Sequence, residues 1–516
     1  MSSRLWAASG QAALESSRML VIAASATATS ILKNLVLPGI GHFTLLDPAL
    51  TSPADAGNNF FLNARESIGK PRASEAVPLL QELNESVDGA ADVRALKDVL
   101  ATPEGQDWVR SFSLVITHNL EQNTLETLSK LLWEDVTGPP LIVVRSSGFL
   151  ADFYIQYHEH CVIESHSETT PSLRLTNPFP ALEQWALEVD YSKLDPTDHG
   201  HIPFAVILVK EAENWKAQHD GKMPQTYAEK QAFKAAIAAH KVKIDEENFE
   251  EAEAQAFRLW SEKPVPLDVS ALFDLPPLNV ACTITPSPSS NTNADPGSPN
   301  ADFHALLCTL KAFVVSEGAL PLTASLPDMK TDTVSYVRLQ KMYRERAGIE
   351  NAMFKDLLRK TFPAAAIAED TIDAFVKNAH HVKLLRGRPY NAFDQDKAAL
   401  ASSLEIFPRE TATHIALSAL SALISRGTEP TGITDEAIKQ EVISLVGQGV
   451  TLPPQLDDAI GEITRAPAAD MPNVAAFLGG MVAQEAIKMI TRQYVPIAGH
   501  CVVDLVDSWT GVVGGA

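Results

Sequence analysis

The residues best placed to do chemistry are the segment VIAASATATS (residues 21–30) and Asp47 beyond it. The segment connects a predicted strand to a predicted helix, which is where nucleotide-binding proteins place the glycine-rich turn that approaches a pyrophosphate. Asp47 follows at about 20 residues, the distance at which such units keep an acid for the ribose hydroxyls. The order of strand, turn, helix, strand and acid therefore indicates a mononucleotide-binding unit.

At this turn, alanines stand where glycines are expected. They alternate with hydroxyl residues in the order Ala24, Ser25, Ala26, Thr27, Ala28 and Thr29. Glycine allows the backbone to approach a pyrophosphate closely, so a Cβ at each position would keep the phosphate out. Two hypotheses stay open on the turn alone: an ordinary strand-to-helix turn that never bound a nucleotide, and a nucleotide site that has been lost.

Two strands and a helix are expected to hold the turn. The apolar, branched run Met19–Ala23 is typical of a buried strand, and the run HFTLLD that ends in Asp47 is typical of a second one. Between them, apolar residues recur at helical spacing, with Ser30 as the expected N-cap and Pro38–Gly39 as the stop. The turn should therefore lie at the carboxyl end of the first strand.

Composition and charge narrow the possible partners. The chain has 516 residues, enough for about three or four domains, and its 45% hydrophobic and 21% charged residues are ordinary for a soluble globular protein. A formal net charge of −22 repels phosphate backbones and acidic membranes, so neither nucleic acid nor a membrane is an expected partner. The same negative charge would attract a partner protein with a basic surface.

No segment indicates a membrane span or a secretion signal. No apolar run approaches the about 20 residues that a span requires, and the N-terminus lacks the layout of a signal peptide. The four cysteines lie far apart without a C-x-x-C pair, so neither a zinc site nor a disulfide framework is expected. We expect a cytoplasmic or nuclear protein with reduced thiols.

The pattern of predicted helices and strands changes along the chain and predicts a discontinuous domain. Residues 1–165 alternate strands and helices, as in an α/β domain with a mostly parallel sheet, and end in one long strand, ADFYIQYHEHCVI. Longer amphipathic helices follow in 166–300, which ends in the flexible linker 285–302, and again in 301–465. Residues 466–516 return to the first style, and we expect their strand to rejoin the first sheet.

No other constellation indicates catalysis or metal binding. The chain has no G-x-S-x-G nucleophile elbow and no cysteine in a recognisable catalytic context. The pairs His158/His160 and His199/His201 could each place two rings on one face of a strand, but two ligands make a poor metal site and no third ligand is near. We predict neither catalytic residues nor a metal site in this chain.

Several longer segments carry a resemblance to a known family. They are RLWAASGQAALESSRMLVI, ATATSILKNLVLPGIGHFTLLD, DAGNNFFLN, NPFPALEQW, LPDMKTDTVSYVRLQKMYRERA and AAFLGGMVAQEAIKMITRQY. The chain resembles, over nearly its whole length, the adenylating domains of ubiquitin-like-protein activating enzymes, and among these the regulatory subunits that act in neddylation. The resemblance implies a Rossmann-like α/β fold of the ThiF/MoeB type, discontinuous and with a degenerate site, that carries a large, mainly helical insertion.

The resemblance identifies where the site departs from the catalytic pattern. Catalytic members have a G-x-G-G-x-G turn, an Asn-Arg-Gln motif, a lysine in the following helix and a Mg²⁺-binding aspartate at the end of a later strand. Here the turn reads AASATA, Asn59 stands at the arginine, Arg72 stands near the lysine, and the strand SLVIT runs into His118 without a carboxylate. Asp47 alone is retained, at the ribose contact. These changes remove charge and room that ATP and Mg²⁺ require.

The resemblance therefore implies a regulatory subunit that is not itself catalytic and binds no cofactor. Its partner would be the catalytic subunit of a heterodimer, which binds ATP and Mg²⁺, carries the thioester-forming cysteine and activates a ubiquitin-like modifier that is passed to cullins. A self-sufficient adenylyltransferase and a nicotinamide-dependent oxidoreductase on a doubly wound fold remain as alternatives. The adenylyltransferase would bind ATP by itself, against the missing glycines, arginine and aspartate, and the oxidoreductase would need a pyrophosphate close to Ala24–Ala28.

The resemblance also implies contact with the catalytic subunit around the segment DMKTDTVSYVRLQK. The candidate contact residues are Asp328, Met329, Tyr336, Leu339, Gln340 and Tyr343. Tyr336, Leu339 and Tyr343 share helical spacing, so a place in the core is an equally open interpretation. Members of the family open with a further arginine before Arg-Leu-Trp, and the resemblance implies that this arginine reaches into the partner's ATP site. Here only the second arginine is matched, by Arg4. Either the start is truncated or this contact with the partner is not used.

Overall fold

The computed structural model describes residues 7–164, 172–244, 246–275, 300–363 and 365–515, and these form two compact units. Unit 1 consists of Met1–Val162 and Leu384–Ala516, and unit 2 of Ile163–Lys383. The structure thus divides the chain at other points than expected, because 384–465 belongs to unit 1 and not to a second half of the insertion. Arg4 and most of the expected linker 285–302 lie outside the described residues.

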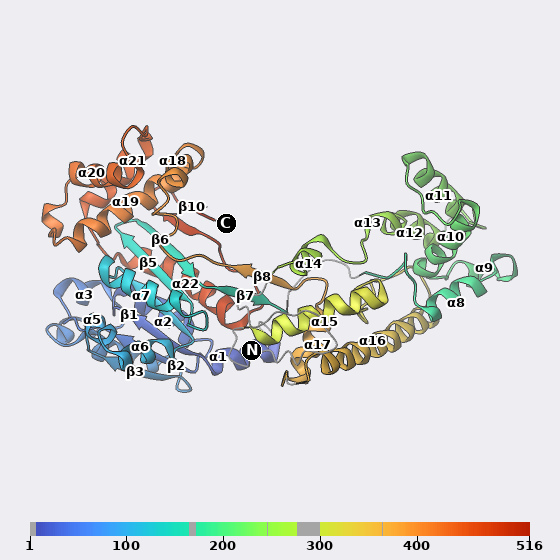
Figure 1. The fold of residues 1–516 in the computed structure, drawn as a ribbon, viewed down its shortest axis with the longest axis horizontal. Coiled ribbons are helices and arrows are strands. Elements are labelled where there is room, and N and C mark those ends of the chain that lie inside the picture. Colours follow the sequence, from blue (N-terminus) through green and yellow to red (C-terminus); the bar gives the residue numbers. More distant parts are fainter. Residues whose placement is uncertain (1–6, 165–171, 245, 276–299, 364, 516) are drawn as a thin grey trace. The chain divides into compact units, whose positions relative to one another are not determined.

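Unit 1 is built on an eight-stranded sheet whose strand order is β10-β9-β6-β5-β4-β1-β2-β3 (Figure 1). The strands are β1 (Arg18–Ile22), β2 (His42–Leu46), β3 (Asp88–Asp92), β4 (Leu114–His118), β5 (Leu141–Ser147), β6 (Leu150–Gln156), β9 (His500–Asp504) and β10 (Trp509–Val513). The five strands from β5 to β3 are parallel, and β6, β9 and β10 are joined antiparallel. The C-terminal segment therefore rejoins the first sheet through β9, as expected.

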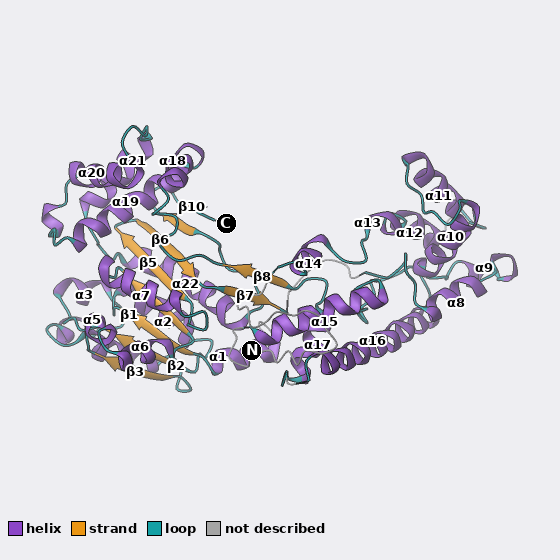
Figure 2. Cartoon of the chain, viewed as in Figure 1, coloured by secondary structure: helices purple, strands orange, loops and turns teal. Residues whose placement is uncertain are grey.

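Helices cover both faces of this sheet (Figure 2). Those of the first part of unit 1 are α1 (Ala7–Glu15), α2 (Ala26–Val36), α3 (Pro53–Asn58), α4 (Arg72–Gln81), α5 (Leu96–Leu100), α6 (Pro103–Arg110) and α7 (Gln122–Glu134). Alternate residues of β1 serve the two layers: Met19 and Val21 pack toward α2 and α4, whereas Leu20 and Ile22 pack toward α5, α6 and α7. This two-sided burial explains why β1 reads as a continuous apolar run.

The second part of unit 1 adds five helices. They are α18 (Lys397–Ile406), α19 (Pro408–Ser425), α20 (Asp435–Val446), α21 (Pro454–Arg465) and α22 (Pro472–Thr491). The first four have a core of their own, to which Leu150 of β6 also belongs, and α19 packs directly on β6, β9 and β10. That packing on the sheet is the reason why 384–465 is part of unit 1.

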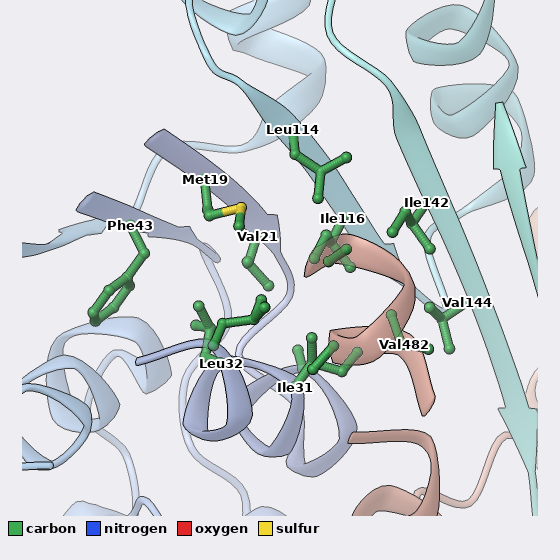
Figure 3. Packing of buried hydrophobic residues seen from close by; sticks show 14 of the residues in the cluster. Met19, Val21, Ile31, Leu32, Phe43, Leu114, Ile116, Ile142, Val144 and Val482 are labelled. Carbon is green, nitrogen blue, oxygen red and sulfur yellow. The ribbon is translucent and has the colours of Figure 1, made fainter. Parts of the chain in front are cut away.

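Helix α22 lies in the core beside α2. Val482 of α22 meets Ile31 and Leu32 of α2 and the strand residues Met19 and Val21 in one apolar cluster (Figure 3). A Cβ added at Gly479 would lie 2.3 Å from Ser30 Oγ, so this glycine permits the close approach of the two helices. Contrary to the expectation from sequence, α22 is long and apolar enough to span a membrane, but 61% of its apolar window is buried inside the protein.

The long strand expected over ADFYIQYHEHCVI is divided in two. Beyond β6, the chain turns at Tyr157 and enters β7 (Glu159–Val162), which pairs with β8 (Lys383–Arg386) in a separate two-stranded sheet. Directly after β8, the Gly387 amide donates to the His158 carbonyl at 3.3 Å, and a Cβ at Gly387 would lie 2.2 Å from the Tyr157 carbonyl oxygen. The chain after β6 therefore leaves the large sheet and lies against β8 and the residue that follows it.

Unit 2 is helical. Its helices are α8 (Pro180–Glu188), α9 (Pro196–His199), α10 (Phe204–Gln218), α11 (Tyr227–Ala239), α12 (Glu247–Gln255), α13 (Arg258–Ser261), α14 (Leu267–Leu272), α15 (Ala301–Glu317), α16 (Thr333–Thr361) and α17 (Glu369–Lys377). The apolar residues of α8, α10, α11 and α12 form its largest core, together with the first part of α16. This agrees with a large, mainly helical insertion in an α/β domain.

Candidate functional site

The turn between β1 and α2 begins with a strained alanine. Ala23 has a φ of 80°, a left-handed value that costs an L-residue about 1–2 kcal/mol and that glycine adopts freely. The helix begins at Ala26 and its N-cap is Ser25, whose Oγ accepts the Ala28 amide at 3.1 Å. The expected N-cap Ser30 is wrong, because the helix starts one turn earlier and Ser30 lies inside it.

Three backbone amides at this turn, those of Ala24, Thr27 and Ala28, donate to side-chain oxygens of the protein itself. The Ala24 amide donates to Asp47 Oδ2 at 2.7 Å. The Thr27 amide donates to Asp470 Oδ2 at 3.1 Å, and the Thr27 hydroxyl donates to Asp470 Oδ1 at 2.6 Å. Such amides are the groups that hold a phosphate in nucleotide-binding turns. Here carboxylates and a serine hydroxyl already occupy them.

Asp47, the acid expected at the ribose, is held in an ion-pair network. It is 3% exposed and lies 2.8 Å from Arg72 Nη2, while Arg72 Nη1 donates to Asp55 Oδ1 at 2.8 Å. Burial acts to lower the pKa of Arg72, but the charges of Asp47 and Asp55 outweigh it and raise that pKa. Arg72 therefore stays charged, and its charge is used to neutralise two carboxylates of the same chain.

Asn59 replaces a cationic contact with a neutral one. It is 5% exposed, its Nδ2 donates to the Ala24 carbonyl at 3.1 Å, and its Oδ1 accepts the Thr29 hydroxyl at 2.9 Å. The amide group thus ties the turn to the first turn of α2. Both polar groups of the Asn59 side chain are therefore used in hydrogen bonds within this unit.

His118 lies at the end of β4, where the resemblance leads us to expect a metal-binding aspartate. Its ring is 2% exposed and bridges two hydroxyls, with Nδ1 2.7 Å from Ser25 Oγ and Nε2 2.8 Å from Ser146 Oγ. Burial lowers the pKa of His118, which favours the neutral ring. A neutral imidazole bonded on both sides offers neither a charge nor a free lone pair to a magnesium ion.

Four of the six predicted positions are joined in one network, which runs from Arg72 through Asp47 to Ala24 and on to Asn59. Ala26 and Ala28 lie buried in the first turn of α2, at 8% and 0% exposure. Sequence reasoning placed Ala23 at the first glycine position of the turn AASATA but did not single it out as the strained residue. It also missed Asp470, which no local pattern could find at a separation of 443 residues.

The candidate contact residues of unit 2 divide into core and surface. Leu339 and Tyr343 are fully buried and Met329 is 7% exposed; the Tyr343 hydroxyl donates to the Leu173 carbonyl at 2.7 Å. Leu339 and Tyr343 therefore lie in the core of unit 2, as the alternative interpretation expects, and Met329 is buried as well. Tyr336 and Gln340 are half-buried and Asp328 is exposed.

A second polar cluster in unit 1 links the sheet to α19. Arg145 of β5 donates from Nε and Nη2, one edge of its guanidinium, to the two carboxylate oxygens of Asp152 of β6. His414 of α19 lies between Asp152 Oδ2 at 2.7 Å and Asp394 Oδ1 at 2.6 Å. Asp152, His414 and His500 would suit a metal ion by residue type. Arg145 Nη2, however, contacts Asp152 and lies 3.1 Å from His414 Nδ1, so a guanidinium already supplies the cation.

The chain is similar to known proteins over nearly its whole length. A model described as the ThiF family matches residues 1–119. The NEDD8-activating enzyme E1 regulatory subunit of Xenopus laevis is 34% identical over 95% of this chain and 93% of its own length. The Drosophila melanogaster protein of that name is 34% identical over 96% and 92%, and the regulatory subunit AXR1 of Arabidopsis thaliana is 31% identical over 98% and 93%.

A solved structure also resembles part of the chain. The crystal structure of E. coli MccB with AMPCPP and MccA has a TM-score of 0.26 and 14% identity, and the overlap covers 31% of this chain and 47% of that one. An overlap of this size carries no inference about function.

Proposed function

This chain belongs to the family of NEDD8-activating enzyme E1 regulatory subunits, and on that premise we propose that it is the non-catalytic half of a heterodimer. Its partner is the catalytic subunit, which binds ATP and Mg²⁺, adenylates the ubiquitin-like modifier and forms the thioester from which the modifier passes on to cullins. This chain binds no cofactor and completes the partner's structure. The proposal includes action in the cytoplasm or the nucleus.

The observation that carries the proposal is the internal use of the turn's donors. Asp47 accepts the Ala24 amide and Asp470 accepts the Thr27 amide, so two groups that would hold a nucleotide hold carboxylates of the chain. Arg72 is already ion-paired with Asp47 and Asp55. A nucleotide would have to displace these bonds and also bring its negative phosphates beside the two carboxylates.

The buried cysteines support the same proposal. Cys161 and Cys501 are 1% and 2% exposed, and burial raises the pKa of the Cys501 thiol to about 12 and raises that of Cys161 as well. A thioester-forming nucleophile needs a reachable thiolate. Neither of these thiols meets that requirement.

The alternatives from sequence are not favoured. A self-sufficient adenylyltransferase and a nicotinamide-dependent oxidoreductase both need a phosphate at Ala24–Ala28, where Ala24 and Ala28 are fully buried. The family assignment also points away from both.

The proposal extends to the partner contact around α16. Because Leu339 and Tyr343 are core residues, the contact involves the exposed side of the same segment, with Asp328 before the helix and Val334 and Val337 in its first turns. These two valines are 78% and 53% exposed. Apolar side chains left in water on a structured helix are suited to burial against another protein.

The experiment that tests the proposal is modifier-dependent ATP/pyrophosphate exchange. The chain alone, the catalytic subunit alone and an equimolar mixture are compared, with a mixture lacking the modifier as the control. We expect no exchange by the chain alone and strong exchange in the mixture. Exchange by the chain alone would contradict a non-catalytic role.

Restoring glycine to the turn is expected not to restore ATP binding. In the triple variant Ala24→Gly, Ala26→Gly and Ala28→Gly, Asn59 still ties down the Ala24 carbonyl and Arg72 is still paired with two carboxylates. Isothermal titration calorimetry should therefore detect no heat of ATP binding. Glycine inside α2 weakens the helix by about 0.5–1 kcal/mol per position, so folding is checked by circular dichroism.

The matched variant is Ala23→Gly, which relieves the left-handed alanine without weakening α2. It too is expected to bind no ATP. Tight ATP binding by either variant would mean that the Cβ atoms alone had closed the site.

A further inference from the structure

The segment before α22 crosses the edge of the sheet where nucleotides bind in α/β proteins. We name residues 466–470 the strap. It is held against the end of β5, where the Gly148 amide donates to the Ala469 carbonyl at 3.1 Å and the Ala468 amide donates to Ser147 Oγ at 3.0 Å. In open α/β sheets, ligands bind outside the carboxyl ends of the parallel strands. The strap therefore covers the place that a ligand would take.

The strap ends in Asp470, whose carboxylate lies at the N-terminus of α2. Both its oxygens are used there, one by the Thr27 amide and one by the Thr27 hydroxyl. The first turn of an α-helix carries free amides and the positive end of the helix dipole, so it attracts anions. The Thr27 side chain is fully buried, which strengthens a bond to a charged acceptor.

Two further contacts fix the carboxylate at this place. Directly after Asp470 the chain enters α22, which approaches α2 so closely that Gly479 has no room for a Cβ against Ser30. On the other side, the strap is anchored by the hydrogen bond from the Ala468 amide to Ser147 Oγ. Ser147 is the neighbour in sequence of Ser146, whose hydroxyl contacts His118. The strap is thus fastened at both ends to elements that form the degenerate site.

We propose that Asp470 is a built-in anion that occupies the N-terminus of α2 in place of a nucleotide phosphate and keeps the site closed. The inference rests on the proposed function and deepens it, because it names the residue of this chain that keeps a nucleotide phosphate out of the degenerate site. Asp470 acts as a positioning residue: it joins the turn of the first segment of unit 1 to the helix of the last one.

The test is anion rescue of the variant Asp470→Ala. Losing the carboxylate leaves the buried Thr27 amide and hydroxyl without their acceptor, and we expect the melting temperature of unit 1 to fall by about 2–5 °C. Sodium formate, a free carboxylate small enough for the vacated place, is then exchanged for sodium chloride at constant ionic strength. We expect formate to recover most of the lost melting temperature in Asp470→Ala and to leave the wild-type chain unchanged.

Hydrogen exchange locates the effect. The peptide containing Thr27 should lose amide protection in Asp470→Ala and regain it in formate. Asp458→Ala is the matched control, because it removes an exposed carboxylate from the same unit and should show neither the loss nor the rescue. A general effect of formate on protein stability would appear in this control.

Two results would overturn the inference: a melting temperature of Asp470→Ala equal to that of the wild type, or a loss that formate recovers no better than chloride. The second result would leave Asp470 as an ordinary packing residue. These measurements use the chain without ATP and without its partner, so their failure would not affect the exchange experiment, and failure of the exchange experiment would not affect them.

Discussion

Replacing Asp152 with alanine is expected to lower the free energy of unfolding by about 3–5 kcal/mol, the range found when one partner of a buried ion pair is removed. Asp152 is 1% exposed and Arg145 is 6% exposed. Burial acts to raise the pKa of Asp152, but the charge of Arg145 outweighs it and holds that pKa well below its usual range. Without Asp152, a buried guanidinium and the His414 ring lose their shared counterion.

Urea unfolding of the full chain, followed by tryptophan fluorescence, measures this loss. The matched control is Asp507→Ala, because Asp507 pairs with Arg409 in the same unit but both side chains are about half exposed. An exposed pair contributes about 0–1 kcal/mol, so this variant should unfold almost as the wild type does. Similar losses in the two variants would contradict the special role of burial.

A double variant separates the charge from the shape of the cluster. In Arg145→Met with Asp152→Leu, both charges are removed together, and His414 keeps Asp394 as its counterion at 2.6 Å. We expect this variant to be more stable than Asp152→Ala, since no unpaired charge remains buried. A double variant less stable than the single one would show that packing, and not the uncompensated charge, sets the cost.

Acid is expected to destabilise unit 1 through His500 before the carboxylates titrate. His500 of β9 is 1% exposed, and neither ring nitrogen has a hydrogen-bond partner among the residues that the structure describes. Burial, together with the neighbouring charge of His414, lowers the pKa of His500 from 6.5 to about 3. Around it stand Tyr154 of β6, Tyr390 and Phe393 as well as His414, and the carboxylates of Asp152 and Asp394 also act on it.

The sign follows from which state binds the proton. Between pH 6.5 and pH 3 the unfolded chain protonates this histidine and the folded chain does not, so stability is full above pH 6.5 and falls as the pH is lowered. One such group contributes a slope of about 1.4 kcal/mol per pH unit. Urea unfolding between pH 4 and pH 6.5 measures the change of the unfolding free energy with pH. In His500→Leu this slope should be smaller by about 1.4 kcal/mol per pH unit, which corresponds to one proton.

His414 contributes in the opposite direction. Burial acts to lower its pKa, but Asp394 and Asp152 outweigh that effect and raise it. Its contribution is therefore complete below the unfolded pKa and is lost as the pH rises through the folded pKa. Equal acid slopes for the wild type and His500→Leu would contradict the assignment to His500.

The sequence predicts well what depends on neighbouring residues. The strand β1, the helix α2, the strand β2 and Asp47 lie where apolar periodicity and spacing place them, because each is specified within a window of a few residues. The N-cap was misassigned to Ser30, since Ser25 and Ser30 both precede a helical pattern and only the hydrogen bond to Ala28 distinguishes them. The break after β6 cannot be read from the strand itself, because β7 pairs with β8, which is distant in sequence.

The closed state of the candidate site depends on contacts that no local pattern contains. Loss of glycine from the turn is visible in sequence, but the partners that replace a ligand are not, because Arg72 and Asp470 meet the turn only in the folded unit. The core role of Leu339 and Tyr343 was similarly undecidable, since a helical stripe can face a core or a partner. Burial in the folded chain decides it.

The return of the C-terminal segment to the sheet has a consequence for synthesis in the cell. When β1, α2 and β2 have left the ribosome, the apolar face of α2 has no α22 to cover it, because α22 is translated only after the whole of unit 2. Over the same interval the Thr27 amide lacks its acceptor, because Asp470 has not yet been synthesised. The time for which this half-built sheet is exposed to chaperones is thus set by the translation of unit 2.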